Sequence, residues 1–302
     1  MSAELLARLG EPQYANWLKA GKCLYMVKEA VEPFADERLR RFHGDLLRER
    51  PRLSQRCSRS CHPADVKLSR ACESCLRWKD EIVKHHRRPA SGVHWDNCAP
   101  AAWRTSHWEL AKAYMPRGQA RVQAARQCDP SALLNLLSCC DCFASVASNT
   151  ARVTELIRFR NELMHSADQR VSDAWMEKFR PALVGFVRLF KRVPDVDLAE
   201  QSLIRMLAVD LSICARDTVD YSGTALAADT VNFGIGPDLV GQWEAALLQE
   251  RLRELRLSAE DEPADREQLM TLDAFLREHK DLSQKFSAEL EANGTRPAPL
   301  DG

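Results

Sequence analysis

The sequence predicts an all-α protein, and three observations support that fold class. Apolar residues recur at helical spacing over several long segments. No series of short alternating segments indicates strands, and no internal repeat is present. Only 12 of the 302 residues are Gly and 14 are Pro, which is not the composition of a disordered chain. With a hydrophobic content of 45%, the chain can bury one large core or two modest ones.

The predicted helices follow in order. Residues 3–50 should form two helices, and the second has an apolar stripe made of Val27, Ala30, Val31, Phe34, Leu39, Phe42, Leu46 and Leu47. Its other face is basic, with Arg38, Arg40, Arg41 and Arg48. Further helices are expected over residues 73–86, 130–147 and 151–167. Ser172 should cap the next one, whose buried stripe runs from Trp175 to Phe190.

These segments suggest a domain organisation. Residues 1–192 are expected to form a helical domain that carries a Cys/His-rich insertion at 52–100, where apolar residues are few. Residues 193–240 are expected to be a linker or a loosely ordered segment. Residues 241–292 should form a C-terminal helical hairpin or short coiled coil, followed by a polar tail at 293–302. The seams of the hairpin are Leu248, Leu252, Leu255, Leu269, Leu272 and Leu276.

The formal net charge is zero, but charge is distributed unevenly. Residues 1–125 contain 23 Lys and Arg against 14 Asp and Glu, a balance of +9, and residues 126–302 contain 20 against 29, a balance of −9. The basic part either attracts a polyanion or matches the acidic part of the same chain. No segment has the roughly 18 consecutive apolar residues of a membrane span, and the N-terminus does not resemble a signal peptide. We therefore expect an intracellular protein, in the cytoplasm or the nucleus, with no membrane partner.

Eleven cysteines in an intracellular protein point to metal binding or to packing rather than to disulfides. Cys72 and Cys75 have the spacing of a zinc knuckle. The remaining ligands are expected among Cys61, His86 and Cys98, with Cys57, His85 and His94 also within reach. A structural Zn²⁺ would order a segment that has little apolar core of its own. Cys139, Cys140 and Cys142 and the tryptophans at 78, 95, 103 and 108 are expected to pack in the core, although indoles near cations also suit base stacking.

Arg160 interrupts an otherwise apolar helical stripe, where an aliphatic residue would be usual. Asn161 and His165 are four residues apart, so they share a helix face. These three side chains suit metal-independent RNA cleavage, in which the 2′-hydroxyl of the RNA is the nucleophile. His165 would act as acid or base, Arg160 would stabilise the phosphate, and Asn161 would orient the imidazole. On spacing alone, the residues fit better a solvated helix end with Arg160 paired to Glu155.

The segment from Val153 to Ser166, with Arg160, Asn161 and His165, resembles the motif of the HEPN superfamily. The helices expected on either side lie where the HEPN bundle places them. The segment Asn16–Gly21 is similar to the first helix of the HEPN domain in a DAZ-interacting RING ubiquitin ligase. Residues 1–192 also resemble a vertebrate family named after open reading frame thirty-eight of chromosome X. The segments that carry this likeness are Lys19–Cys23, Cys72–Lys79, His85–His86, His94–Pro100, Ala111–Gly118 and Arg160–Ser166.

The resemblance implies a HEPN-like bundle and an RNA partner. Active HEPN ribonucleases use two copies of the motif across a dimer, so it also implies a homodimer. Two functions remain open. The first is an RNA-binding HEPN protein that acts as an endoribonuclease through Arg160, Asn161 and His165. The second is a non-catalytic adaptor that binds protein partners through its helical surfaces, including the C-terminal helices.

Overall fold

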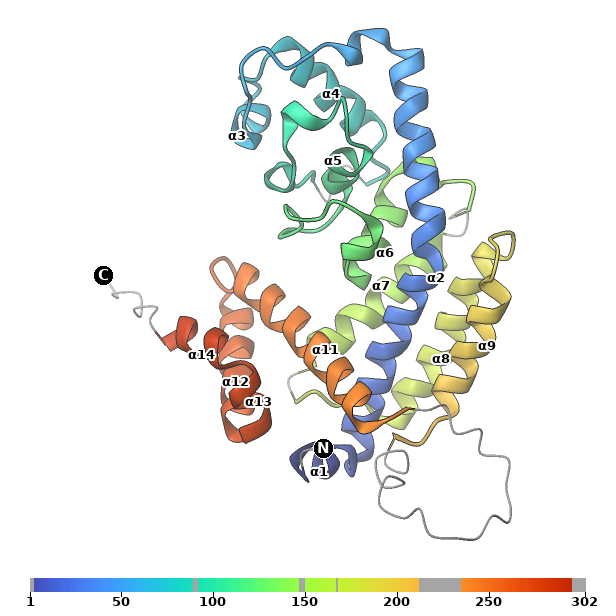
Figure 1. Ribbon diagram of the computed structural model, residues 1–302, viewed down its shortest axis with the longest axis vertical. Helices are drawn as coiled ribbons and strands as arrows, with labels where there is room; N and C mark the ends of the chain where they lie inside the picture. The colour runs from blue at the N-terminus through green and yellow to red at the C-terminus, as the bar shows by residue number, and fades with distance from the viewer. Residues whose placement is uncertain (1–2, 89–91, 147–149, 167, 212–234, 295–302) are drawn as a thin grey trace. The chain divides into compact units, whose positions relative to one another are not determined.

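Regular secondary structure is helical throughout the residues that the computed structural model describes, which are 3–88, 92–146, 150–166, 168–211 and 235–294 (Figure 1). Within these ranges there is no β-strand, and His86 and Cys140 form an isolated antiparallel bridge. The all-α class predicted from the sequence is therefore confirmed. None of the described helices is both long enough and apolar enough to cross a membrane.

The chain divides into two units, each assembled from segments that are distant in sequence. Unit 1 contains Met1–Lys22, Glu162–Glu177 and Leu207–Gly302, and unit 2 contains Cys23–Asn161 and Lys178–Met206. The divisions that the sequence predicts, at residues 192 and 240, are not among these boundaries. The long helix α2 (Pro12–Glu49) contributes its first turns to unit 1 and the rest to unit 2.

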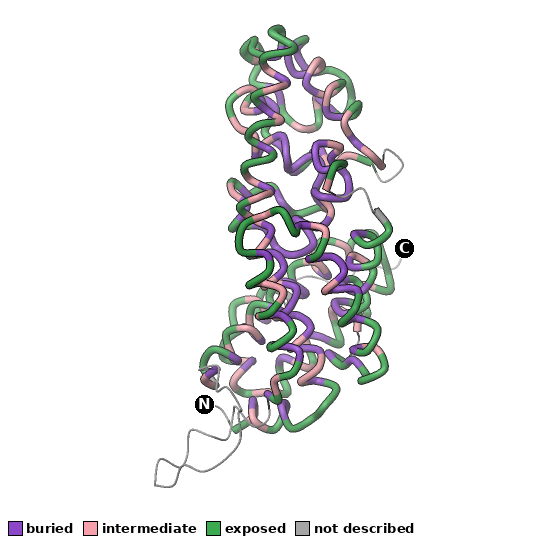
Figure 2. Tube along the Cα trace, turned by 90° about the vertical axis from the view of Figure 1, so that its right-hand side faces the viewer, coloured by how far each residue is buried: buried purple, intermediate pink, exposed green. Residues whose placement is uncertain are grey.

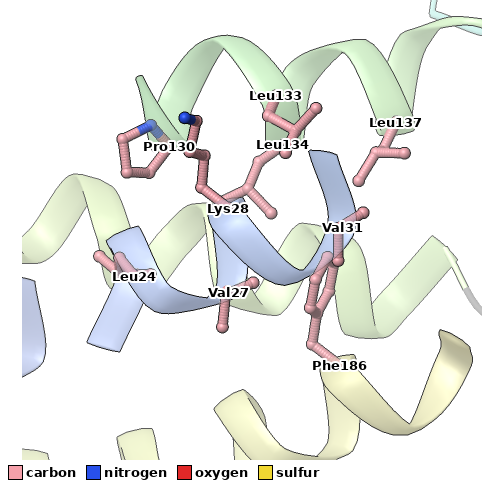
Figure 3. Close-up of a pocket in the computed structure, with 9 residues that line it drawn as sticks. All are labelled: Leu24, Val27, Lys28, Val31, Pro130, Leu133, Leu134, Leu137 and Phe186. Carbon is pink, nitrogen blue, oxygen red and sulfur yellow. The ribbon is translucent and has the colours of Figure 1, made fainter. Parts of the chain in front are cut away.

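The core of unit 2 lies where α2, α6 (Pro130–Cys139) and α8 (Asp173–Val187) meet. Figure 3 shows apolar side chains of α2 and α6 facing one another, with Phe186 of α8 below them. The cavity between them is about 10 Å³, which holds no more than a water molecule. Lys28 is buried at its edge, and its ammonium group binds the Arg126 carbonyl at 2.9 Å and the Glu32 carboxylate at 2.8 Å. The buried charge is therefore paired, as a stable core requires.

The predicted helix starts are confirmed at α6 and α8. The Asp129 carboxylate accepts a hydrogen bond from the backbone N–H of Ala132, and Pro130 follows at the first helical position. The Ser172 hydroxyl accepts one from the N–H of Trp175. However, α6 ends at Cys139 rather than at 147, because the chain then turns extended and forms the bridge to His86.

Helix α7 (Thr150–Met164) agrees with its expected segment, but the linker expected over 193–240 needs a correction. Residues Val196–Ala208 form helix α9, which buries Leu203 and Met206. Its apolar stripe is short and two large apolar side chains, Leu198 and Ile204, stay exposed, so the sequence pattern was weak. Residues 212–234 of the expected linker, and the tail from 295 on, lie outside the described residues.

Between α2 and α6, unit 2 is built from short helical turns: η1 (Pro51–Ser54), α3 (Pro63–Lys67), α4 (Glu73–Lys84), η3 (Trp95–Asn97), η4 (Pro100–Ala102), α5 (His107–Ala111), η5 (Lys112–Tyr114) and η6 (Ala125–Gln127). Two more, η7 (Asp141–Phe143) and η8 (Arg188–Phe190), follow α6 and α8. Val83 of α4 is 44% exposed, because the helix buries the face that carries Cys75, Trp78 and Ile82.

Buried amide and indole groups fix these turns to one another. The Asn97 side chain donates to the carbonyls of Lys112 and Pro116 and accepts from the N–H of Gln119. All four tryptophans of this region, at 78, 95, 103 and 108, are at most 9% exposed, so the packing role predicted for them is confirmed. Since their faces are covered, they do not form a stacking platform for bases.

Unit 1 contains α1 (Ala3–Leu9) and the C-terminal helices α11 (Pro237–Ser258), α12 (Pro263–Glu278), α13 (Lys280–Lys285) and α14 (Ser287–Gly294). Helices α11 and α12 pack against each other through the leucine seams predicted for the hairpin, with Leu269 only partly buried. Gly21 of α2 lies against α11: a Cβ atom there would come within 2.4 Å of a Leu247 methyl carbon. This close approach of the two helices explains why a residue without a side chain stands at position 21.

A buried ion-pair network joins α1 to α11 and α13 within unit 1. Arg8 is 4% exposed, and its guanidinium contacts Glu244 at 2.7 Å and Asp281 at 3.0 Å. The Tyr14 hydroxyl donates to the Glu244 carboxylate at 2.7 Å. Burial alone would lower the pKa of Arg8, but the two carboxylates outweigh it and raise the pKa, so Arg8 stays charged.

We expect Arg8→Met to destabilise unit 1 by about 3–5 kcal/mol, because it leaves the buried Glu244 carboxylate without its cation. The matched control is Arg170→Met, which removes an exposed ion pair with Glu11 in the same unit and should cost less than about 1 kcal/mol. Calorimetric unfolding of both variants checks the difference. Equal losses of stability would contradict the role assigned to the Arg8 network.

Candidate functional site

Four cysteines of unit 2 bring their sulfur atoms together. The Sγ atoms of Cys57, Cys61, Cys72 and Cys75 all lie within 4.8 Å of one another. Cys57 and Cys61 lie in the loop between η1 and α3, Cys72 is the residue that caps α4, and Cys75 is in the first turn of α4. A group of four thiols at such distances could hold a metal ion.

Local turns on both sides of α3 fold this part of the chain back on itself. Ser60 and Ser69 have positive φ angles of 50° and 56°, so the direction of the chain changes before and after α3. The Asp65 carboxylate accepts a hydrogen bond from the N–H of His62 at 2.8 Å, which satisfies a free donor at the start of α3. The two turns place the Cys57–Cys61 loop beside the start of α4.

Backbone amides point at the sulfur atoms. The N–H of Cys61 donates to Cys57 Sγ at 3.3 Å, and the N–H of Cys72 donates to Cys61 Sγ at 3.1 Å. Burial raises the pKa of the Cys72 thiol, but hydrogen bonds from backbone N–H groups and from neighbouring thiols outweigh it and lower the pKa to about 6. Burial and the neighbouring thiols instead raise the pKa of Cys61 and of Cys75, so in the absence of a metal ion the amide donors favour the thiolate at Cys72.

The structure brings together three of the five residues predicted from the sequence as ligands, and adds Cys57. Cys61, Cys72 and Cys75 belong to the cluster, whereas His86 and Cys98 do not. His86 is buried, stacks on the ring of Tyr114 at 5.6 Å, and pairs through its backbone with Cys140. Sequence spacing left Cys57 as one of several alternatives, because a three-residue gap before Cys61 is no more characteristic than the other gaps.

Cys98 lies in a different environment from the four clustered cysteines. It follows the η3 turn and is 6% exposed. Burial, followed by the carboxylate of Glu109, raises the pKa of its thiol to about 12. Cys98 therefore remains a neutral thiol at physiological pH and serves as a packing residue.

A second group of cysteines lies at the end of α6. Cys139, Cys140 and Cys142 are all buried, and the Sγ atoms of Cys140 and Cys142 are 3.3 Å apart. Burial raises the pKa of Cys142 well above its usual range. These thiols fill core space, in agreement with the packing role predicted for them.

The three residues of the Arg–His motif differ widely in accessibility. Arg160, on α7 in unit 2, is 4% exposed. Asn161, the next residue, is exposed. His165 follows the last residue of α7 and belongs to unit 1, and its side chain is 49% exposed. Of the three, Asn161 and His165 are accessible to a ligand from solvent.

Two residues of unit 1 that the sequence did not single out lie close to His165 or to its loop. The Nδ1 atom of His165 is 3.8 Å from a carboxylate oxygen of Asp265 on α12. Arg251 of α11 is 1% exposed, and its guanidinium has no hydrogen-bond partner among the described residues. Burial lowers the pKa of Arg251 to about 10, partly offset by the negative charge of Asp168 in the loop after His165. The sequence signal that could have identified Arg251 is its place next to Leu252 in the leucine seam of α11.

Comparisons with known proteins agree with the vertebrate family suggested by residues 1–192. A protein from Mus musculus, "Uncharacterized protein CXorf38 homolog", is 34% identical over 301 residues, covering 96% of this chain and 91% of that protein. No solved structure matches the chain. The model of a domain of unknown function, DUF4559, matches residues 8–294. The chain therefore belongs to the DUF4559 family.

Proposed function

We propose that the protein binds one structural Zn²⁺ ion through Cys57, Cys61, Cys72 and Cys75. The observation that supports this is the spacing of the four sulfur atoms. Zn–S bonds of about 2.3 Å in a tetrahedron place the sulfurs about 3.8 Å apart. Cys57 Sγ and Cys72 Sγ are 3.7 Å apart, and all six pairs lie within 4.8 Å.

Zinc at this position would be structural. Four thiolates complete a tetrahedral coordination sphere, so no position is left for water or substrate. The segment around the cluster has few apolar side chains, and its helices α3 and α4 are 5 and 12 residues long. Such short elements gain little stability from their own core, and metal binding can supply it.

We expect the purified protein to contain about one zinc per chain, and Cys72→Ser and Cys75→Ser to lose it, since each removes a ligand. Cys98→Ser is the matched control, because it also replaces a buried thiol of unit 2 but should retain the metal. Elemental analysis measures the zinc, and calorimetry should show a lower Tm after chelation. Full zinc content in the Cys72 or Cys75 variant would rule out this ligand set.

A second candidate function is RNA binding with metal-independent cleavage by Arg160, Asn161 and His165, within a HEPN-like bundle that pairs as a homodimer. The position of His165 favours it: the imidazole is half-exposed and its Nδ1 lies 3.8 Å from Asp265, a carboxylate that can orient the ring. Arg160 is 4% exposed, so phosphate stabilisation requires that RNA or the second copy uncover the guanidinium. Without that step the chain binds but does not cleave.

Cleavage is tested in excess EDTA with wild type, His165→Ala and Arg160→Ala, each checked for fold and for retained zinc. The expected products carry 2′,3′-cyclic phosphate and 5′-hydroxyl ends. Loss of His165 should lower the rate by about 10²–10⁴, the usual contribution of an acid or base.

A well-folded dimer that cleaves no RNA would exclude the ribonuclease. The protein would then be the adaptor, which binds protein partners through its helical surfaces, with the motif as a structural feature. Sedimentation analysis gives the oligomeric state in the same preparation, and a strict monomer would also exclude a site built from two motifs.

A further inference from the structure

Exposed cations surround the cysteine cluster. Arg56, Arg59, Lys67 and Arg70, here called the basic face, are all exposed, and none forms an ion pair with any residue that the structure describes. The arginines of α2 differ: Arg40, Arg41 and Arg48 are each paired with a carboxylate three or four residues earlier. The basic face thus carries positive charge that the described part of the chain does not neutralise.

The cysteine cluster itself gathers these cations. Arg56 precedes Cys57, Arg59 lies between Cys57 and Cys61, and Arg70 is two residues before Cys72, so the convergence of the sulfurs brings all three together. The Arg59 guanidinium donates to the carbonyl of Arg70 at 3.2 Å, which links the segment before α3 to the segment after it.

Lys67 ends α3, which is held against α4 by the bond from the Lys79 ammonium to the Val66 carbonyl at 2.8 Å. Figure 1 shows α3 and α4 at one end of unit 2, and Figure 2 shows exposed residues along the outer turns of that end.

Charge neutralisation of the metal centre does not account for the basic face. Residues 50–70 contain six cations and one carboxylate, Asp65. A zinc ion with four thiolates carries a charge of −2 and Arg50 is paired with Glu81, so about two positive charges remain. Leu68, between Lys67 and Arg70 in sequence, is 58% exposed, so an apolar side chain is available beside the cations.

We infer that the basic face binds single-stranded nucleic acid, with the cations on phosphates and Leu68 on an unstacked base. Phosphate contacts suit a surface of several free cations on a rigid turn. An exposed apolar side chain can reach a base when the base is not inside a duplex. The tryptophans of this region are buried, so stacking adds little and the face should bind strands of different sequence similarly. This inference rests on the proposed zinc site for the shape of the face, but not on RNA cleavage.

The full-length protein is titrated against fluorescein-labelled 20-nucleotide strands of uridine and of deoxythymidine, by fluorescence anisotropy at several salt concentrations. We expect binding to both, weakening with salt. The triple variant Arg56→Gln, Lys67→Gln, Arg70→Gln should bind about tenfold more weakly at 0.1 M salt, and the slope of log K against log salt should fall by about 2 in magnitude, since about 0.7 is lost per contact. Arg59 is left in place because of its bond to the loop.

The matched control is the triple variant Arg40→Gln, Arg41→Gln, Arg48→Gln. It also removes three positive charges from unit 2, but from exposed arginines that are paired with carboxylates, so the affinity for both strands should be nearly unchanged. Equal weakening in the two triple variants would overturn the inference. A protein that binds neither strand but binds an acidic polypeptide probe, poly-L-glutamate, would overturn it as well. Zinc is measured in every preparation. If the protein contains zinc but binds neither strand, nucleic-acid binding by the basic face is refuted and the metal site stands. If the folded protein contains no zinc, the proposed metal site is refuted.

Discussion

The convergence of four cysteine sulfurs is the constraint on which the middle of unit 2 depends. Between η1 and α4 the buried apolar side chains are few, and α3 is only five residues long. A chain of this kind does not bury enough apolar surface to offset the conformational entropy lost on folding. The turns at Ser60 and Ser69 bring the Cys57–Cys61 loop to the start of α4, and the sulfur cluster lies where the two meet.

Unit 1 depends on a different interaction. There the leucine seams of α11 and α12 supply apolar burial, while Arg8, Tyr14, Glu244 and Asp281 form a buried polar network. A buried ion pair is stable only when each charged group is fully hydrogen-bonded, so such a network specifies one arrangement of α1 and α11. Gly21 adds a steric condition, since α2 and α11 approach so closely that a side chain there would meet Leu247.

Helices with a long apolar stripe could be predicted from the sequence, because periodicity reports the buried face directly. Helix α8, with its buried stripe after the Ser172 cap, and the leucine seams are examples. Helix α9 was missed because its stripe is short and partly exposed. The end of α6 depends on a bridge to His86, a contact over more than fifty residues that no local pattern contains.

The site shows the same division. The pair Cys72 and Cys75 is visible from spacing, since both lie on one turn at the start of a helix. Cys57 and Cys61 join it through tertiary folding, and the choice between Cys57, His86 and Cys98 is made by turns at Ser60 and Ser69 and by the burial of the other two. Likewise Asp265 and Arg251 come near the loop after α7 from helices about a hundred residues later in the chain.

The same reasoning separates the two candidate sites by chemistry. The cysteine cluster could hold a metal ion, since four sulfurs lie close together, three of the four cysteines are buried, and backbone amides donate to the sulfurs. The His165 side chain is half-exposed to solvent, whereas the Arg160 side chain is buried. A chelator acts on the first site and leaves the chemistry of the second untouched. The metal binding proposed for the first site and the RNA cleavage proposed for the second can therefore be tested independently.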